Sequence, residues 1–121
     1  MSAHDRSYLL HIQEFISRVT EYTKDGRSEF IKSPIIQDAV VRNIELIGEA
    51  VKNLSDTAKV SRPEIPWRSI ARMRDKIIHH YFALNLELVW EVVDKHLPPL
   101  SKCVDAMLRD IEAQKKNDGT P

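Results

Sequence analysis

The sequence of 121 residues contains one cysteine, three glycines and no long apolar run. A single cysteine, Cys103, excludes an internal disulfide framework and a zinc site built from several cysteines. No apolar run approaches the roughly 20 residues that a membrane-spanning helix needs, and the N-terminal segment lacks the apolar stretch of a secretory signal. We therefore expect a cytoplasmic protein of one domain, with no membrane partner.

The formal net charge is zero, because 18 lysines and arginines balance 18 aspartates and glutamates. Taken alone, a zero sum argues against a dedicated nucleic-acid binder. The charge is nevertheless uneven: six basic and two acidic residues give residues 59–80 a charge of +4, and the remainder carries −4. This basic segment lies beside aromatic residues and is compatible with phosphate contact, although charge alone favours a solvated helix face.

Few glycines and apolar residues at intervals of three and four predict helices throughout. We expect an all-α fold, an up-down bundle of four or five helices, in a single domain over residues 1–113 with a flexible C-terminal tail over 114–121. Two capping signals are clear, since Ser33 and Asn85 each stand before an apolar periodic segment. The expected helices cover about residues 8–22, 34–55, 66–81, 86–96 and 100–111, with a non-helical connector over 57–66 and a break or kink at Pro98-Pro99.

Asn43 falls inside the apolar stripe of the second expected helix, between Val40 and Ile47. A buried amide costs a few kcal/mol unless its hydrogen bonds are met, so Asn43 needs partners. It is either a structural amide or a group that orients a functional side chain. Glu45, by contrast, falls on the opposite face of the same helix, where solvated residues are expected.

Arg74 presents the same anomaly on the third expected helix, because it lies within about 40° of Trp67 and Ile78 on a helical wheel. A partly buried guanidinium requires an anion, which is either an internal carboxylate or a bound phosphate. His79 lies about 140° from Arg74 on one straight helix, so the two would not converge there. They would meet if the helix frayed, or if a second copy of the chain supplied one of them. Taken alone, His79 is more often a structural or surface residue.

The segment RDKIIHHY, residues 74–81, has the form R-x-x-x-x-H-x-Y. It resembles the signature of HEPN-domain proteins, specifically the HepT toxins encoded beside a minimal nucleotidyltransferase antitoxin. The segment RNIELIGEAVKNL, residues 42–54, resembles that family's second helix, and residues 66–90 resemble its core. The resemblance covers essentially residues 5–112.

This resemblance implies a homodimer with the motif in the cleft between the protomers. It also implies a toxin that acts as a metal-independent endoribonuclease, with tRNA as the expected substrate. His79 would be the catalytic general acid or base, and Arg74 would bind the scissile phosphate. Asn43 would take a supporting role near the motif. We expect no metal and no cofactor in this chain.

Tyr81 carries a further implication of the resemblance. In similar systems the partner nucleotidyltransferase transfers AMP from ATP to this hydroxyl, so ATP and magnesium are requirements of the antitoxin. Adenylylation (AMPylation) would block RNA by charge and bulk. From periodicity alone, Tyr81 would be a core aromatic residue at a helix end.

Two other functions remain open at the level of sequence. The first is a non-catalytic helical subunit that binds RNA or nucleotide, or that scaffolds a nucleotidyltransferase complex. It is motivated by the short motif and by the lack of an acidic or metal-binding constellation. The second assigns the antitoxin role to this chain and the toxin role to the transferase.

Overall fold

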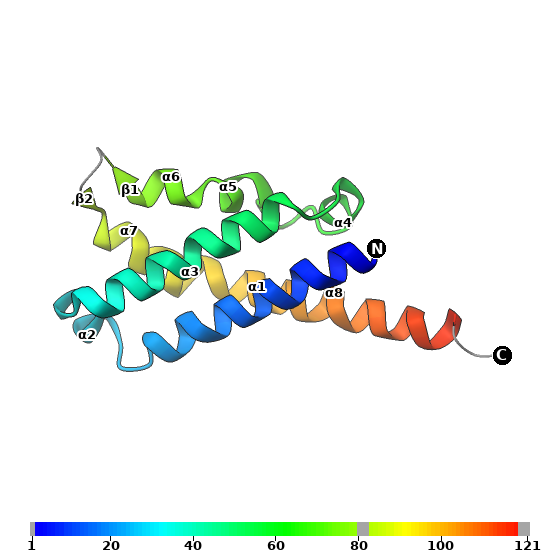
Figure 1. Ribbon diagram of the computed structural model, residues 1–121, viewed down its shortest axis with the longest axis horizontal. Helices are drawn as coiled ribbons and strands as arrows, with labels where there is room; N and C mark the ends of the chain where they lie inside the picture. Colours follow the sequence, from blue (N-terminus) through cyan, green and yellow to red (C-terminus); the bar gives the residue numbers. More distant parts are fainter. Residues whose placement is uncertain (1, 80–82, 119–121) are drawn as a thin grey trace.

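The computed structural model describes residues 2–79 and 83–118, and these residues confirm the all-α fold class. Figure 1 shows four helical layers that run alternately in opposite directions: α1 (Ala3–Tyr22), α3 (Pro34–Lys52), the pair α5 (Trp67–Ala71) and α6 (Met73–Ile77), and a long rod that ends in α8 (Leu97–Asp118). The two termini lie at one end of the bundle (Figure 1). The described residues thus form the expected up-down bundle.

Short elements connect these layers. Among the described residues they are the helices α2, α4 and α7, the π-helical turn η1 and the strands β1 and β2. Their bounds are α2 Arg27–Lys32, α4 Asp56–Val60, β1 Ile78–His79, β2 Ala83–Leu84, α7 Leu86–Glu91 and η1 Val92–His96. Helices α2 and α4 have at most six residues and were not predicted from apolar periodicity, whereas α7 and η1 together cover the helix predicted over residues 86–96.

The two predicted caps are confirmed. The Ser33 hydroxyl accepts a hydrogen bond from the backbone N–H of Ile36 at 3.2 Å, and Pro34 follows at the first helical position. The Asn85 side chain accepts one from the backbone N–H of Leu88 at 3.1 Å. These side chains satisfy N–H groups that have no partner within their own helices.

The prediction of one continuous third helix is wrong. Helix α5 ends at Ala71, α6 ends at Ile77, and β1 then pairs antiparallel with β2, with Ile78 opposite Leu84. The backbone N–H of Asn85 donates to the carbonyl of Ile77 at 3.1 Å, which extends the hairpin pairing. Two consecutive β-branched residues favour an extended chain here, and the cross-strand bonds replace those of another helical turn.

Three further boundaries differ from the prediction. Residues 57–66 contain most of α4, which is capped by the hydroxyl of Ser55. The helix is not broken at Pro98-Pro99, because the chain runs through η1 into α8, and the π-turn accommodates prolines that lack a backbone N–H. Helix α8 also extends to Asp118, so much of the predicted tail is helical.

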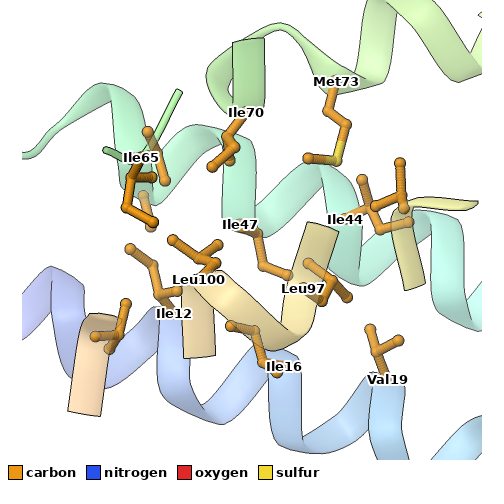
Figure 2. Close-up of a cluster of buried hydrophobic side chains, with 14 of the residues drawn as sticks. Ile12, Ile16, Val19, Ile44, Ile47, Ile65, Ile70, Met73, Leu97 and Leu100 are labelled. Carbon is orange, nitrogen blue, oxygen red and sulfur yellow. The ribbon is translucent and has the colours of Figure 1, made fainter. Parts of the chain in front are cut away.

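The core lies between the four layers and is filled by branched aliphatic side chains. Figure 2 shows side chains of α1, α3, α5–α6 and α8 that point toward one another: Ile12, Ile16, Val19, Ile44, Ile47, Ile70, Met73, Leu97 and Leu100. Cys103 is also buried, 3.7 Å from the Met107 sulfur, and its burial raises the pKa of the thiol. Among the helices of the described residues, none has the length and hydropathy required to cross a bilayer.

Asp5 is a buried carboxylate that joins the N-terminal ends of α1 and α4. It accepts hydrogen bonds from the backbone N–H and the hydroxyl of Ser55, at 2.8 and 2.7 Å, and from the backbone N–H of Ser2 at 3.3 Å. Burial raises the pKa of Asp5, but these hydrogen bonds lower it more, so the net shift is downward. The ionised carboxylate therefore stabilises the fold.

We predict that Asp5→Asn lowers the free energy of unfolding by about 1–3 kcal/mol at neutral pH, since an amide cannot accept all of these bonds. Because the pKa of Asp5 is lower in the folded state, its stabilisation is complete above the unfolded value near 3.8 and disappears as pH falls through the folded value. Urea denaturation between pH 7 and pH 3 measures both effects. Asp38→Asn, at an exposed aspartate, is the control, and equal losses in the two variants would contradict the prediction.

Candidate functional site

The described residues of the predicted motif, 74–79, lie toward the end of the bundle opposite the two termini (Figure 1). Arg74 is on α6, and the backbone of His79 belongs to β1, where it pairs with Ala83. Since the helix ends at Ile77, the predicted angle between Arg74 and His79 on one straight helix does not apply. The predicted convergence of the two side chains, and the whole of Tyr81, lie outside the described part of the chain.

Arg74 is exposed, so its predicted place in an apolar stripe is wrong. Its side chain is 62% accessible, and its Nε lies 3.8 Å from Oε2 of Glu45. The prediction assumed that Trp67 and Arg74 share one helix, whereas Arg72 has non-helical dihedral angles between α5 and α6. The guanidinium of Arg74 is therefore accessible to a phosphate from solvent. The carboxylate of Glu45 lies beside it but is too far away for a hydrogen bond.

Glu45 is a residue of this site that the sequence prediction missed. It was expected to be a solvated side chain, but it is only 24% exposed and lies between two guanidinium groups, 3.8 Å from Arg42 and 3.8 Å from Arg74. The spacing from Arg42 to Glu45 could have indicated the first ion pair. The second depends on how α3 packs against α6 and has no signal in the sequence.

For the RNA binding that the family resemblance implies, we predict that Glu45→Gln lowers the Kd by up to about fivefold, because an exposed ion pair of about 0.2–1 kcal/mol no longer competes with phosphate for Arg74. Titration of a fluorescent RNA with 2′-deoxy substitutions, which prevent cleavage, measures the Kd. Glu49→Gln removes a carboxylate that pairs with Lys52 on the same helix, and is the matched control. Weaker binding by Glu45→Gln would show that Glu45 supports the arginine instead.

The burial of Asn43 is confirmed, at 5% exposure. Its Nδ2 donates to the carbonyl of Ala39 at 2.8 Å, and its buried Oδ1 has no hydrogen-bond partner among the described residues. Asn43 precedes Glu45 by two residues, so it points about 200° away around α3, toward the side that does not face Arg74. One copy of the chain thus does not bring Asn43 to Arg74, and the supporting role remains a prediction.

Carboxylates from outside the basic segment neutralise only part of its charge. Arg62 is bound by Asp110 of α8, and Arg74 lies near Glu45, but Arg68, Arg72 and Lys76 are exposed and form no ion pair with any described residue. Four of these basic side chains lie on α5, on α6 or at the residue between the two helices: Arg68, Arg72, Arg74 and Lys76. The excess positive charge is therefore concentrated on the layer that carries the motif.

Comparison with known proteins identifies the class. A protein-family model described as Ribonuclease HepT-like matches residues 12–107. A protein of Methanocaldococcus jannaschii named as a putative RNase is 40% identical over 113 residues, which is 93% of each chain. One of Thermococcus cleftensis, named as a probable ribonuclease HepT, is 42% identical over 101 residues, 83% of this chain and 92% of its own. No solved structure matches.

The described residues place the chain in the class of small all-α helical bundles, with an exposed arginine on a cationic layer. Within it, the match over most of the length shows that the chain belongs to the HepT-like ribonuclease family. The resemblance inferred from residues 74–81 and 42–54 is therefore confirmed.

Proposed function

We propose that this protein is an endoribonuclease that cleaves RNA without a metal ion and acts as the toxin of a toxin–antitoxin pair. The observation that carries the proposal is the exposure of Arg74, the first residue of the R-x-x-x-x-H-x-Y motif. Arg74 lies on the cationic α5–α6 layer of a chain that belongs to the HepT-like ribonuclease family. Membership of the family supports ribonuclease activity. The geometry of α6 supports access of a phosphate to Arg74.

The proposed reaction uses the nucleophile that RNA itself contains. The 2′-oxygen attacks the adjacent phosphorus while the bond from phosphorus to the 5′-oxygen breaks. His79 accepts the proton of the 2′-hydroxyl or donates a proton to the departing 5′-oxygen. Arg74 stabilises the charge that develops on the non-bridging oxygens. The products are a 2′,3′-cyclic phosphate and a 5′-hydroxyl.

The proposal includes a homodimer with the motif in the cleft between protomers. Such a reaction needs one base and one acid, and two copies of His79 would supply both. Two layers that each carry Arg68, Arg72, Arg74 and Lys76 would also form one cationic groove from two neutral chains. The acidic remainder of each chain would discourage RNA binding elsewhere.

The experiment is incubation of purified full-length protein with total tRNA, followed by a denaturing gel and end labelling. The expected products carry a 5′-hydroxyl that polynucleotide kinase labels without prior phosphatase treatment. Products with a 5′-phosphate would contradict the proposed chemistry. An absence of cleavage at high protein concentration, with RNA still bound, would support a non-catalytic subunit instead.

We predict that excess EDTA leaves the cleavage rate unchanged within about twofold, since proton transfer and phosphate binding are assigned to His79 and Arg74. Parallel reactions at constant ionic strength, with EDTA and with added magnesium, measure this. A loss of activity in EDTA that magnesium restores would refute the metal-independent mechanism. The control for chelation is a metal-dependent nuclease, which should no longer cut the same tRNA in the presence of EDTA.

The proposed regulation acts on Tyr81, two residues after His79. A partner minimal nucleotidyltransferase, using its own ATP and magnesium, would attach AMP to the tyrosine hydroxyl. The added phosphate would repel RNA by its charge, and the nucleoside would add bulk at the motif. A transferase encoded in the adjacent reading frame would support this pairing.

A further inference from the structure

A cavity of about 220 Å³ lies between α5–α6 and the α7–η1 rod, on the layer that carries the proposed catalytic residues. Its walls are largely apolar, with Pro66, Ile70, Met73, Ile77, Leu88 and Val92 lining it. Figure 2 shows Ile70 and Met73 pointing from this layer toward the bundle. For comparison, an engineered cavity of about 150 Å³ in another protein holds a benzene molecule. An aromatic ring system therefore fits this cavity by volume.

Three polar side chains complete the lining of the cavity. They are the Ser69 hydroxyl, the Lys76 ammonium and the His96 imidazole, and the last lies 4.0 Å from the carboxylate of Glu91. Lys76 forms no ion pair with a described residue, and all three side chains are exposed. A largely apolar cavity with a few convergent polar groups is the usual form of a small-ligand site. Here a free cation at the rim favours a ligand that carries negative charge.

The π-helical turn contributes to this cavity directly. Val92 begins η1 and His96 ends it, and both line the cavity. Continuing α-helical turns would rotate His96 relative to Val92, so the wider turn determines where the imidazole lies. Single π-turns within helices occur frequently at functional sites.

We propose that this cavity binds one nucleobase of the RNA substrate, with Lys76 and His96 contacting the phosphate of the same nucleotide. The inference rests on the proposed ribonuclease function. It adds a second contact between the protein and the RNA substrate, besides the contact of Arg74 with the scissile phosphate. A base has flat faces that can pack against the apolar lining of the cavity. The phosphate of the same nucleotide would supply the negatively charged partner that Lys76 does not have among the described residues. Lys76 follows Arg74 by two residues on α6, so the two side chains lie on different sides of that helix, and we assign the cavity to a nucleotide other than the one at the scissile phosphate.

Methionine methyl groups offer a direct readout, because the chain contains three methionines and, of the two within the described residues, only Met73 lines the cavity. We expect 5′-AMP, 5′-GMP, 5′-CMP or 5′-UMP to shift the Met73 signal of [methyl-13C]methionine protein saturably. The signal of the buried Met107, assigned with a Met107→Leu variant, should not move. No Met73 shift at millimolar nucleotide, or an equal shift with ribose 5-phosphate, would overturn the base pocket.

Two variants test the occupant further. Ser69→Trp fills the cavity from an exposed position and should raise the Kd of the best nucleotide about tenfold or more, as expected for loss of base stacking. Ser7→Trp, at an exposed site on α1, is the matched control. Lys76→Ala should weaken nucleotide binding several-fold, whereas Lys32→Ala on α2 should not. Unchanged affinity in both Ser69→Trp and Lys76→Ala would overturn the proposal.

The same measurements separate this inference from the proposed function. If Met73 does not respond but tRNA is still cleaved in a manner that requires Arg74 and His79, the pocket is wrong and the ribonuclease stands. If Met73 responds but the protein cleaves no RNA, the pocket stands and the enzyme assignment fails. Protection of Met73 by a second copy of the chain would give no nucleotide response and would count against the pocket.

Discussion

His79→Ala is expected to lower the rate of RNA cleavage by about 10²–10⁴-fold, the range for loss of a general acid or base. Alanine cannot accept the proton of the 2′-hydroxyl or protonate the leaving 5′-oxygen, so the chemical step slows while RNA binding persists. The measurement is single-turnover cleavage of a labelled tRNA at saturating protein. The Kd for a 2′-deoxy-substituted RNA should change by less than about threefold, because the role assigned to His79 is proton transfer in the chemical step.

His11→Ala is the matched control for this result, since His11 is an exposed histidine on α1, a different layer. Arg74→Ala should impair both the cleavage step and RNA binding, because the guanidinium is assigned to the phosphate in the ground state and the transition state. Circular dichroism establishes that each variant is folded. Equal cleavage by His79→Ala and the parent protein would refute the catalytic assignment, whatever the effect of Arg74→Ala.

Long elements with strong periodicity were predictable from the sequence. Helices α1 and α3 carry apolar residues at helical spacing over many turns, and Ser33 and Asn85 are caps whose chemistry is local. Such features depend on neighbours within a few residues along the chain. The family could likewise be identified from the sequence, because its signature lies within the short segment of residues 74–81.

The third layer was mispredicted because tertiary contacts interrupt it. Its apolar residues keep approximate helical spacing, but the chain leaves the helix at Arg72 and again after Ile77, where the hairpin to β2 begins. A helical wheel drawn through these interruptions placed Arg74 on the wrong face. An angular argument is valid only over a length in which every residue is helical.

The surroundings of Arg74 depend on packing between layers. Glu45 and Arg74 lie 29 positions apart in the sequence and meet because α3 packs against α6. The bond between Arg62 and Asp110 likewise joins the end of α4 to α8. A sum of charges could therefore locate the basic segment but not determine which of its members remain available to RNA.

Tyr81→Phe is expected to make the protein resistant to its antitoxin. Phenylalanine keeps the ring but removes the hydroxyl that the proposed AMP transfer requires, so the modification cannot form. Co-expression with the partner nucleotidyltransferase should then leave growth arrested, whereas the parent chain should be neutralised. Intact mass spectrometry should show the added mass of AMP on the parent protein and none on the variant.

The control for this experiment is Tyr22→Phe, which removes the hydroxyl of a tyrosine that is 39% exposed on α1. That variant should still be modified and neutralised. Because Tyr81 follows His79 by two residues, Tyr81→Phe must also be shown to cleave tRNA at the parent rate when the partner is absent. A Tyr81→Phe protein that is cleavage-competent yet still neutralised would place the modification elsewhere, or would show that the antitoxin acts by binding alone. Retained neutralisation together with an unmodified parent protein would establish the second of these, because a bound partner can cover the cationic layer without transferring AMP.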